Sequence, residues 1–264
     1  MKALKKYRWP LTGALLGVMV FLAVYGVRVL DPTSVDWILN NPSPDPAQHY
    51  LGWELFRRSP VHLPYLGANY SAVYPFRTSV LFTDSLPLAA LFFKLLGGIL
   101  PTRFQYFGWW GLLCYALQGG LAQAVIARIA GLKPDQKAKL WGSVAGAGVL
   151  VLFPALTMRT FAHEALAATW LVLLALYLWL RSDEIMPTTR RACLIWGGMG
   201  LLCAGIHLYY LPMVGLVLVG YAVRRALQKR GPAAVLAPIA AFCAAALAEL
   251  VLLGAFAVNF AGYS

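Results

Sequence analysis

Residues 86–100 read LPLAALFFKLLGGIL, an apolar stretch of 15 residues with Pro87 near its start and Lys94 inside it. A helix needs about 20 mostly apolar residues to cross the hydrocarbon core of a membrane, and shorter apolar runs are usually buried, interfacial or re-entrant. We therefore expect this stretch to lie against a membrane rather than to cross it. The placement matters because every later segment would change sides if the stretch did cross.

The rest of the chain has the composition of a membrane protein. Of its 264 residues, 60% are hydrophobic, 13% are aromatic and 12% are charged, whereas soluble domains carry roughly 25% charged residues. So few charges cannot cover a surface that faces water, which excludes a soluble enzyme, and the aromatic content excludes a disordered chain. The four cysteines lie in apolar runs and predict neither disulfide bonds nor a metal cluster.

Seven other apolar runs are predicted to cross the membrane. They are residues 11–30, 104–130, 140–158, 165–180, 192–205, 211–226 and 233–257. The expected fold class is all-α: one module over residues 1–264, a polytopic transmembrane helical bundle of about seven spans with interfacial helices in a long first outer loop at 31–103. The glycine pairs Gly13/Gly17 and Gly142/Gly146 predict close helix packing.

Basic residues predict the orientation of this bundle. If residues 86–100 do not cross, 15 of the 22 lysines and arginines fall on one side, in segments 1–10, 128–139, 181–191 and 224–230. The positive-inside rule places that side in the cytoplasm, together with the N-terminus. Because a basic excess in a membrane protein orients its loops, the net charge of +12 predicts no nucleic-acid partner.

The strongest local pattern is Asp45-Pro46-Ala47-Gln48-His49-Tyr50, at the start of a predicted interfacial helix. Asp45 at the N-cap with Pro46 at the first helical position resembles a capping box, which gives Asp45 a purely structural role. Alternatively, Asp45 and His49 share one helix face four residues apart. A carboxylate beside an imidazole can deprotonate a hydroxyl or bind a metal ion.

A second acid, Asp84, lies in Phe82-Thr83-Asp84-Ser85-Leu86-Pro87. It is either an N-cap of the short apolar stretch or, if the outer loop folds back, a partner of Asp45. Two carboxylates at the outer rim would form an acid/base pair or hold a divalent cation, which is the one cofactor the sequence suggests.

Two more polar clusters lie in predicted outer turns. Arg159 and His163 are one helical turn apart, and Arg159 is suited to bind a phosphate or to form an ion pair with Glu164. His207, Tyr209 and Tyr210 belong either to an interfacial aromatic belt or to a groove for a lipid phosphate. All four clusters fall on the same side of the predicted bundle, which indicates a site there.

Three stretches, at residues 45–53, 82–87 and 104–108 (Phe104-Gln105-Tyr106-Phe107-Gly108), resemble the GT-C glycosyltransferases, and within them an uncharacterised bacterial family. The resemblance implies an enzyme of the bacterial inner membrane with a seven-span module. It would move a sugar from a polyprenyl-phosphate donor to a glycan or lipid acceptor on the outer side. Asp45 matches the base-like acid of the first outer loop, Asp84 matches an acid before the interfacial helix, and Glu164 loosely matches an acid of the second loop. That loop usually bears Asp, so metal dependence stays open.

The expected mechanism is inverting sugar transfer, with Arg159 and His207 on the donor phosphate and Asp45 as the base. The candidate site residues are Asp45 and Asp84 as catalytic groups, and His49, Tyr50, Arg159, His163, Glu164, His207, Tyr209 and Tyr210 as substrate-binding groups. Two alternatives stay open: a transporter or flippase of lipid-linked sugars, and a non-catalytic subunit of a glycan-assembly complex. GT-C enzymes often continue beyond this module, so the chain is expected to be either a fragment or a minimal module that needs a partner.

Overall fold

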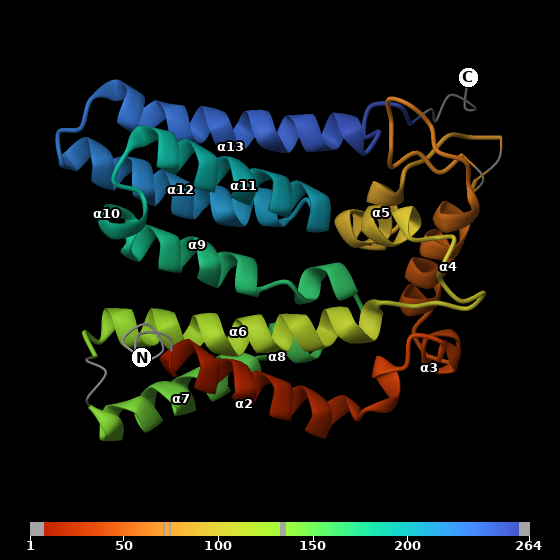
Figure 1. The fold of residues 1–264 in the computed structure, drawn as a ribbon, viewed down its shortest axis with the longest axis horizontal. Helices are drawn as coiled ribbons and strands as arrows, with labels where there is room; N and C mark the ends of the chain where they lie inside the picture. Colours follow the sequence, from red (N-terminus) through yellow and green to blue (C-terminus); the bar gives the residue numbers. More distant parts are fainter. Residues whose placement is uncertain (1–7, 71, 74, 133–135, 259–264) are drawn as a thin grey trace. The chain divides into compact units, whose positions relative to one another are not determined.

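The structure, a computed structural model, describes residues 8–258 except 71, 74 and 133–135 (Figure 1). Lys2, Lys5 and Lys6 of the predicted basic N-terminus, Lys133 and the C-terminal residues 259–264 lie outside the described residues. The chain divides into two compact units. Unit 1 contains residues 1–34 and 105–181, and unit 2 contains residues 35–104 and 182–264. Each unit is described by itself.

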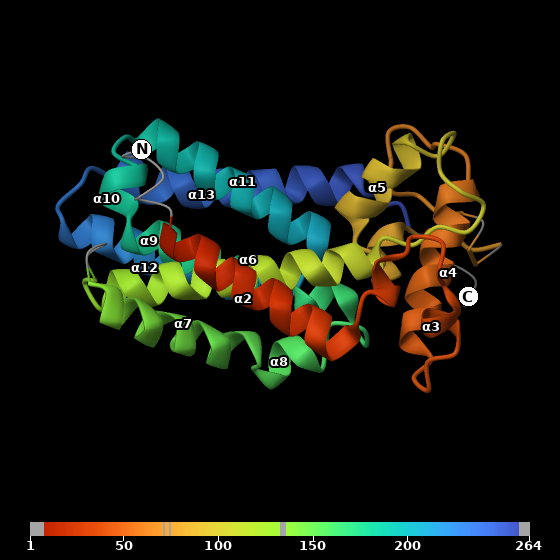
Figure 2. The ribbon, with the colours of Figure 1, turned by 60° about the horizontal axis from the view of Figure 1, so that its bottom comes forward.

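Unit 1 is a group of helices built around α6. Its elements are α2 (Arg8–Tyr25), η1 (Arg28–Leu30), α6 (Phe107–Ile129), α7 (Lys137–Val151), α8 (Pro154–Thr157), η3 (Glu164–Ala167) and α9 (Trp170–Leu180). Helices α2, α7 and α9 all pack on α6, and both views show α2 and α7 running beside it (Figures 1 and 2).

The predicted close packing at Gly13 and Gly17 is confirmed. A Cβ atom at Gly13 would lie 2.3 Å from the carbonyl oxygen of Gly119, and one at Gly17 would lie 2.0 Å from that of Tyr115. The backbones of α2 and α6 can touch only because these positions carry no side chain. The prediction for the second pair is wrong at Gly142, where a Cβ atom would meet nothing within 4 Å.

Unit 2 combines the long loop with the last three long helices. Its elements are α3 (Asp36–Leu39), α4 (Asp45–Arg58), η2 (Val80–Phe82), α5 (Pro87–Leu95), α10 (Ser182–Ile185), α11 (Thr189–Ile206), α12 (Tyr210–Leu227) and α13 (Pro232–Leu252). Helices α11, α12 and α13 lie side by side (Figure 1). At Gly200 of α11 an added Cβ would lie 2.4 Å from the Phe242 carbonyl of α13, so these two helices also meet backbone to backbone.

Within the described ranges every regular element is helical, and only an isolated bridge joins Ala68 to Ser79. Three helices, α6, α12 and α13, are long and apolar enough to cross a membrane. The predicted runs 11–30, 140–158 and 165–180 form shorter apolar helices instead. Helix α2 ends just before Gly26, whose φ of 74° is typical of a glycine that terminates a helix. Helix α7 ends before Pro154, which begins α8, because a proline disfavours helix at the preceding residue.

The stretch at 86–100 contains only the nine-residue helix α5. At 1.5 Å per residue its length is roughly 14 Å, about half of a hydrocarbon core, in agreement with a stretch that does not cross. Lys94 near its end donates to the Phe56 carbonyl at 2.8 Å and to Ser59 Oγ at 3.1 Å, at the C-terminus of α4. The lysine therefore caps α4, and burial lowers its pKa to about 8.

Candidate functional site

In unit 2 the loop that carries Asp84 lies against helix α4. Gly52 makes this approach possible, because a Cβ atom there would lie 2.5 Å from Thr83 Cβ and 2.8 Å from Ser85 Oγ. Ser85 Oγ donates to the His49 carbonyl at 2.7 Å and shares a hydrogen bond with Thr83 Oγ1 at 2.8 Å. The loop is thus fastened to the helical turn that bears His49.

The backbone of this loop adopts an uncommon conformation. Asp84 has φ of 53° and Leu86 has φ of 56°, both in the left-handed region. Asp tolerates this region, but a buried leucine there is an outlier that costs of order 1–3 kcal/mol. Such strain persists only where surrounding contacts over-determine it, and it clusters at functional sites. The N-cap of α5 is Leu86, so Asp84 does not cap this helix.

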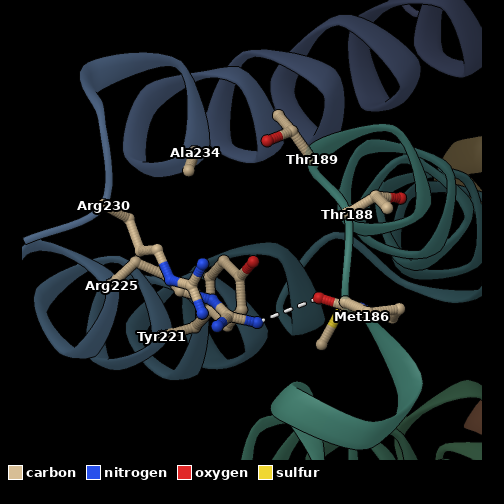
Figure 3. A pocket seen from close by; sticks show the side chains of 8 residues that line it. Met186, Thr188, Thr189, Tyr221, Arg225, Arg230 and Ala234 are labelled. Atoms are coloured by element: carbon tan, nitrogen blue, oxygen red, sulfur yellow. Dashed lines mark hydrogen bonds between the residues drawn. The ribbon is translucent and has the colours of Figure 1, made fainter. Parts of the chain in front are cut away.

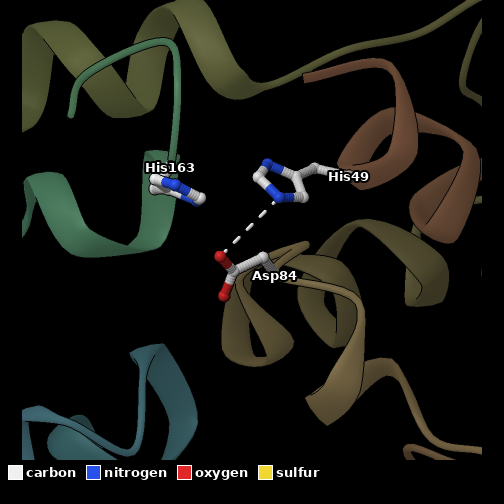
Figure 4. Close-up of side chains that lie close together, drawn as sticks. All are labelled: His49, Asp84 and His163. Carbon is white, nitrogen blue, oxygen red and sulfur yellow. Dashed lines mark ion pairs between the residues drawn. The ribbon is translucent and has the colours of Figure 1, made fainter. Parts of the chain in front are cut away.

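The carboxylate of Asp84 lies between two imidazoles from distant parts of the sequence. His207 Nε2 lies 3.1 Å from Asp84 Oδ1, and His49 Nε2 lies 3.6 Å from Asp84 Oδ2. Figure 4 shows His49 on its helix pointing at the Asp84 carboxylate. The side chains are 5%, 23% and 17% exposed for His49, Asp84 and His207, so the carboxylate is the most accessible member of the three.

The protonation of His207 follows from its second contact. The backbone N–H of Tyr209 donates to His207 Nδ1 at 3.2 Å. A nitrogen that accepts a hydrogen bond carries no proton, so the proton of the neutral ring is on Nε2 and is donated to Asp84. His207 therefore holds the carboxylate in a fixed orientation.

Asp45 begins the helix that carries His49. The predicted cap is wrong by one residue: the N-cap is Pro44, whose side chain makes no capping bond, and Asp45 is the first helical residue. One helical turn separates Asp45 from His49, so both residues lie on one face of α4. On that face, His49 contacts the Asp84 carboxylate. The loop that carries Asp84 does lie against α4, which is the condition on which the sequence paired Asp84 with Asp45.

The three tyrosines of the prediction differ in access. Tyr50 and Tyr210 are 5% and 2% exposed, so they belong to the packed interior of unit 2 rather than to a substrate surface. Burial, with Glu54 four residues on, raises the pKa of Tyr50 to about 12. Tyr209 is 61% exposed, and its ring lies 4.6 Å from that of His207, where it can contact a ligand.

The remaining predicted residues belong to unit 1. Arg159 and His163 do share a helical turn, since the His163 N–H donates to the Arg159 carbonyl at 2.9 Å. Arg159 is exposed whereas Glu164 is fully buried, and the described residues contain no ion pair between them. The Glu164 carbonyl accepts a hydrogen bond from Trp110 Nε1 at 2.8 Å. The predicted ion pair is wrong, because the turn buries one partner and exposes the other.

The cluster in unit 2 can position a charged carboxylate and a proton donor side by side. Asp84 and His49 are also ligands that a divalent cation accepts, and such an ion commonly binds one or two protein groups together with substrate phosphates. His207 fits that role poorly, because Nε2 holds the proton while Nδ1 accepts from Tyr209. The sequence missed Gly52, Thr83 and Ser85, whose only signal was their nearness to His49 and Asp84.

Comparison with known proteins gives one result. A family model described as a domain of unknown function (DUF6311) matches residues 14–264. No curated protein and no solved structure matches the chain.

Proposed function

This chain belongs to the DUF6311 family, and we propose that it is an integral membrane glycosyltransferase. It moves a sugar from a polyprenyl-phosphate donor to a glycan or lipid acceptor on the extracytoplasmic side. Its apolar helices associate with a lipid bilayer, which is where a donor of this kind resides.

One observation carries the proposal: Asp84 is held between His207 and His49 in a strained loop, at the end of α11. A structural carboxylate does not need a left-handed backbone and two imidazole partners. A carboxylate that orients a substrate or a cation benefits from both, because its fixed orientation is set before the substrate arrives.

In the proposed reaction Asp45 takes the proton of the acceptor hydroxyl. The acceptor oxygen attacks the anomeric carbon from the side opposite the phosphate, and the bond between that carbon and the phosphate oxygen breaks. The polyprenyl phosphate leaves with the bonding electron pair. Asp84 and His49 orient the donor, and a divalent cation bound to this pair would offset the charge of the leaving phosphate.

The same proposal includes the topology. We infer seven crossings of a bacterial inner membrane, formed by α2, α6, α7, α9, α11, α12 and α13, with the N-terminus in the cytoplasm. Helix α11 has 18 residues and is about 27 Å long, close to the thickness of the hydrocarbon core. It separates His207 at its C-terminal end from the basic segment at its N-terminal end, as the positive-inside rule requires.

The test uses membranes that contain the full chain, incubated with polyprenyl-phosphate-linked sugars. Mass spectrometry is expected to detect free polyprenyl phosphate and a glycosylated acceptor. Asp45→Asn is expected to reduce both by at least about 100-fold, the usual contribution of a general base. Asp36→Asn is the matched control, because Asp36 is an exposed acid of the same loop on α3.

Two results would reject the proposal. One is full transfer activity in Asp45→Asn together with Asp84→Asn. The other is movement of the labelled lipid across proteoliposomes without a covalent product, which would identify a flippase.

A further inference from the structure

A polar pocket lies at the end of unit 2 opposite to Asp84. It is formed where the segment before α11, the last turns of α12 and the first turn of α13 meet. The polar side chains of its lining are Thr188, Thr189, Tyr221, Arg225 and Arg230 (Figure 3). Its volume is about 60 Å³. That is room for roughly four water molecules, or for one phosphate group.

Arg225 forms the wall of this pocket and is only 5% exposed. Its guanidinium donates to Asp183 Oδ1 at 2.8 Å and to Gln228 Oε1 at 3.2 Å, and also to the carbonyls of Ser182 at 3.2 Å and Met186 at 3.0 Å. Its plane lies over the Tyr221 ring at 5.1 Å. Arg225 is thus immobile, and it supplies positive charge rather than free donors.

The described residues that line the pocket include two arginines and no acidic side chain. Asp183 also accepts from Arg224 at 2.5 Å, so one carboxylate serves two guanidiniums. Burial raises the pKa of Asp183, but the charges of Arg224 and Arg225 outweigh it and hold that pKa below its usual value. Arg230 adds a third positive charge, and its side chain has no hydrogen-bond or ion-pair partner among the residues the structure describes.

Hydroxyl groups complete the lining on the other side. Thr188 is the N-cap of α11, and its Oγ1 accepts from the Arg191 N–H at 3.3 Å, which leaves its own proton to donate. Thr189 follows at the first helical position. The exposed Arg230 guanidinium and the two threonine hydroxyls can donate to phosphate oxygens, and Arg225 adds a fixed positive charge behind them.

The surroundings of the pocket favour a lipid over a soluble ligand. The two helices that contribute Arg225 and Ala234 to the lining also expose large apolar side chains near this end, Leu227 at 79% and Leu236 at 62%, on other faces than the one that lines the pocket. Both belong to helices that are apolar and long enough to cross a membrane. Basic pockets between such helices commonly bind the headgroups of anionic lipids, with the acyl chains along the apolar faces.

We propose that this pocket binds the phosphate of an anionic phospholipid headgroup, with Arg230, Thr188 and Thr189 as the direct ligands and Arg225 as the fixed charge behind them. The geometry of one unit carries this assignment, and it is independent of the catalytic proposal.

The test measures lipid binding to the purified full chain in detergent by native mass spectrometry. Phosphatidylglycerol is titrated against phosphatidylcholine, which carries the same phosphate but no net charge. The wild type is expected to bind one phosphatidylglycerol in preference to phosphatidylcholine. Arg230→Gln is expected to weaken that binding by about tenfold or more, the effect of losing a charge-assisted hydrogen bond.

Arg190→Gln is the matched control, because Arg190 is exposed next to Thr189 but does not line the pocket. It removes the same charge from the same end of the unit and is expected to change binding less than about twofold. Thermal unfolding of both variants verifies that they fold.

Equal binding by Arg230→Gln and Arg190→Gln would overturn the proposal, as would a wild type with no preference between the two lipids. Displacement of bound phosphatidylglycerol by inorganic phosphate would overturn the assignment to a membrane lipid and point to a soluble phosphate compound.

Discussion

The two ends of unit 2 each hold a carboxylate between two nitrogen-bearing side chains. At one end Asp84 lies between His49 and His207, and at the other Asp183 lies between Arg224 and Arg225. A guanidinium offers only donors, in a planar fork that matches a carboxylate, whereas an imidazole can offer one nitrogen as a donor and the other as an acceptor or metal ligand.

The two clusters also differ in how the backbone supports them. Arg225 satisfies neighbouring carbonyls and a carboxylate from a regular helix, so it ties α12 to α10. Asp84 lies in a left-handed turn and is more accessible than its two partners. We infer that the arginine cluster stabilises the fold and its pocket, while strain in the Asp84 loop holds the carboxylate that we propose orients the donor.

The largest expected effect is on activity at Asp84. Asp84→Asn keeps the shape of the side chain, and Asn tolerates the left-handed region, so the loop should retain its conformation. Loss of the charged carboxylate that orients the donor is expected to lower sugar transfer by about 100-fold, with little change in thermal unfolding. Transfer assays and unfolding curves on the same preparation check this, and a large loss of stability with activity intact would reverse the assignment of the two ends.

The next effect is on stability at the opposite end. Arg225→Ala leaves the buried carbonyls of Ser182 and Met186 without their donor, and it is expected to lower the free energy of unfolding by about 3 kcal/mol. The matched variant Arg224→Ala removes a guanidinium that is 36% exposed and contacts the same Asp183. Its expected cost is below about 1 kcal/mol. Equal losses in the two variants would show that burial of Arg225 does not distinguish them.

The smallest expected effect is a pH dependence at the Asp84 end. The folded pKa of Lys94, about 8, lies below the value near 10.4 of an unfolded lysine. Between these values the unfolded chain binds more protons, so stability rises as pH increases from about 8 to about 10.4. The unfolding temperature of the wild type minus that of Lys94→Met should therefore increase as pH rises over that range. A difference that stays constant with pH would contradict it.

The sequence predicted the helical composition and one helix–helix contact of this structure. The composition predicted a helical, membrane-associated protein, and Gly13 and Gly17 predicted one helix crossing. Both are properties of local sequence. The length of residues 86–100 likewise predicted a helix too short to cross. Helix ends were harder to predict from sequence. The predicted span at 165–180 contains the 11-residue helix α9 only in its later part, because the 3-10 helix η3 forms its beginning.

The site was predictable only as a set of candidates. Asp45 and His49 share a face because four residues make about one helical turn, which sequence spacing reveals. That Asp84 reaches His207 instead of capping α5 depends on Gly52, on the hydrogen bonds of Ser85 and on a left-handed backbone. None of these has a periodic pattern.

The sequence by itself determined that this protein associates with a membrane, and it determined which kinds of side chain are available for chemistry. Both follow from hydropathy and residue type, which are properties of single positions in the chain. Only the tertiary structure decided which side chains meet. Residues 224–230 read merely as basic, yet folding buried Arg225 and left Arg230 at the mouth of a pocket. Burial and pairing depend on neighbours distant in the chain, and packing alone selects them.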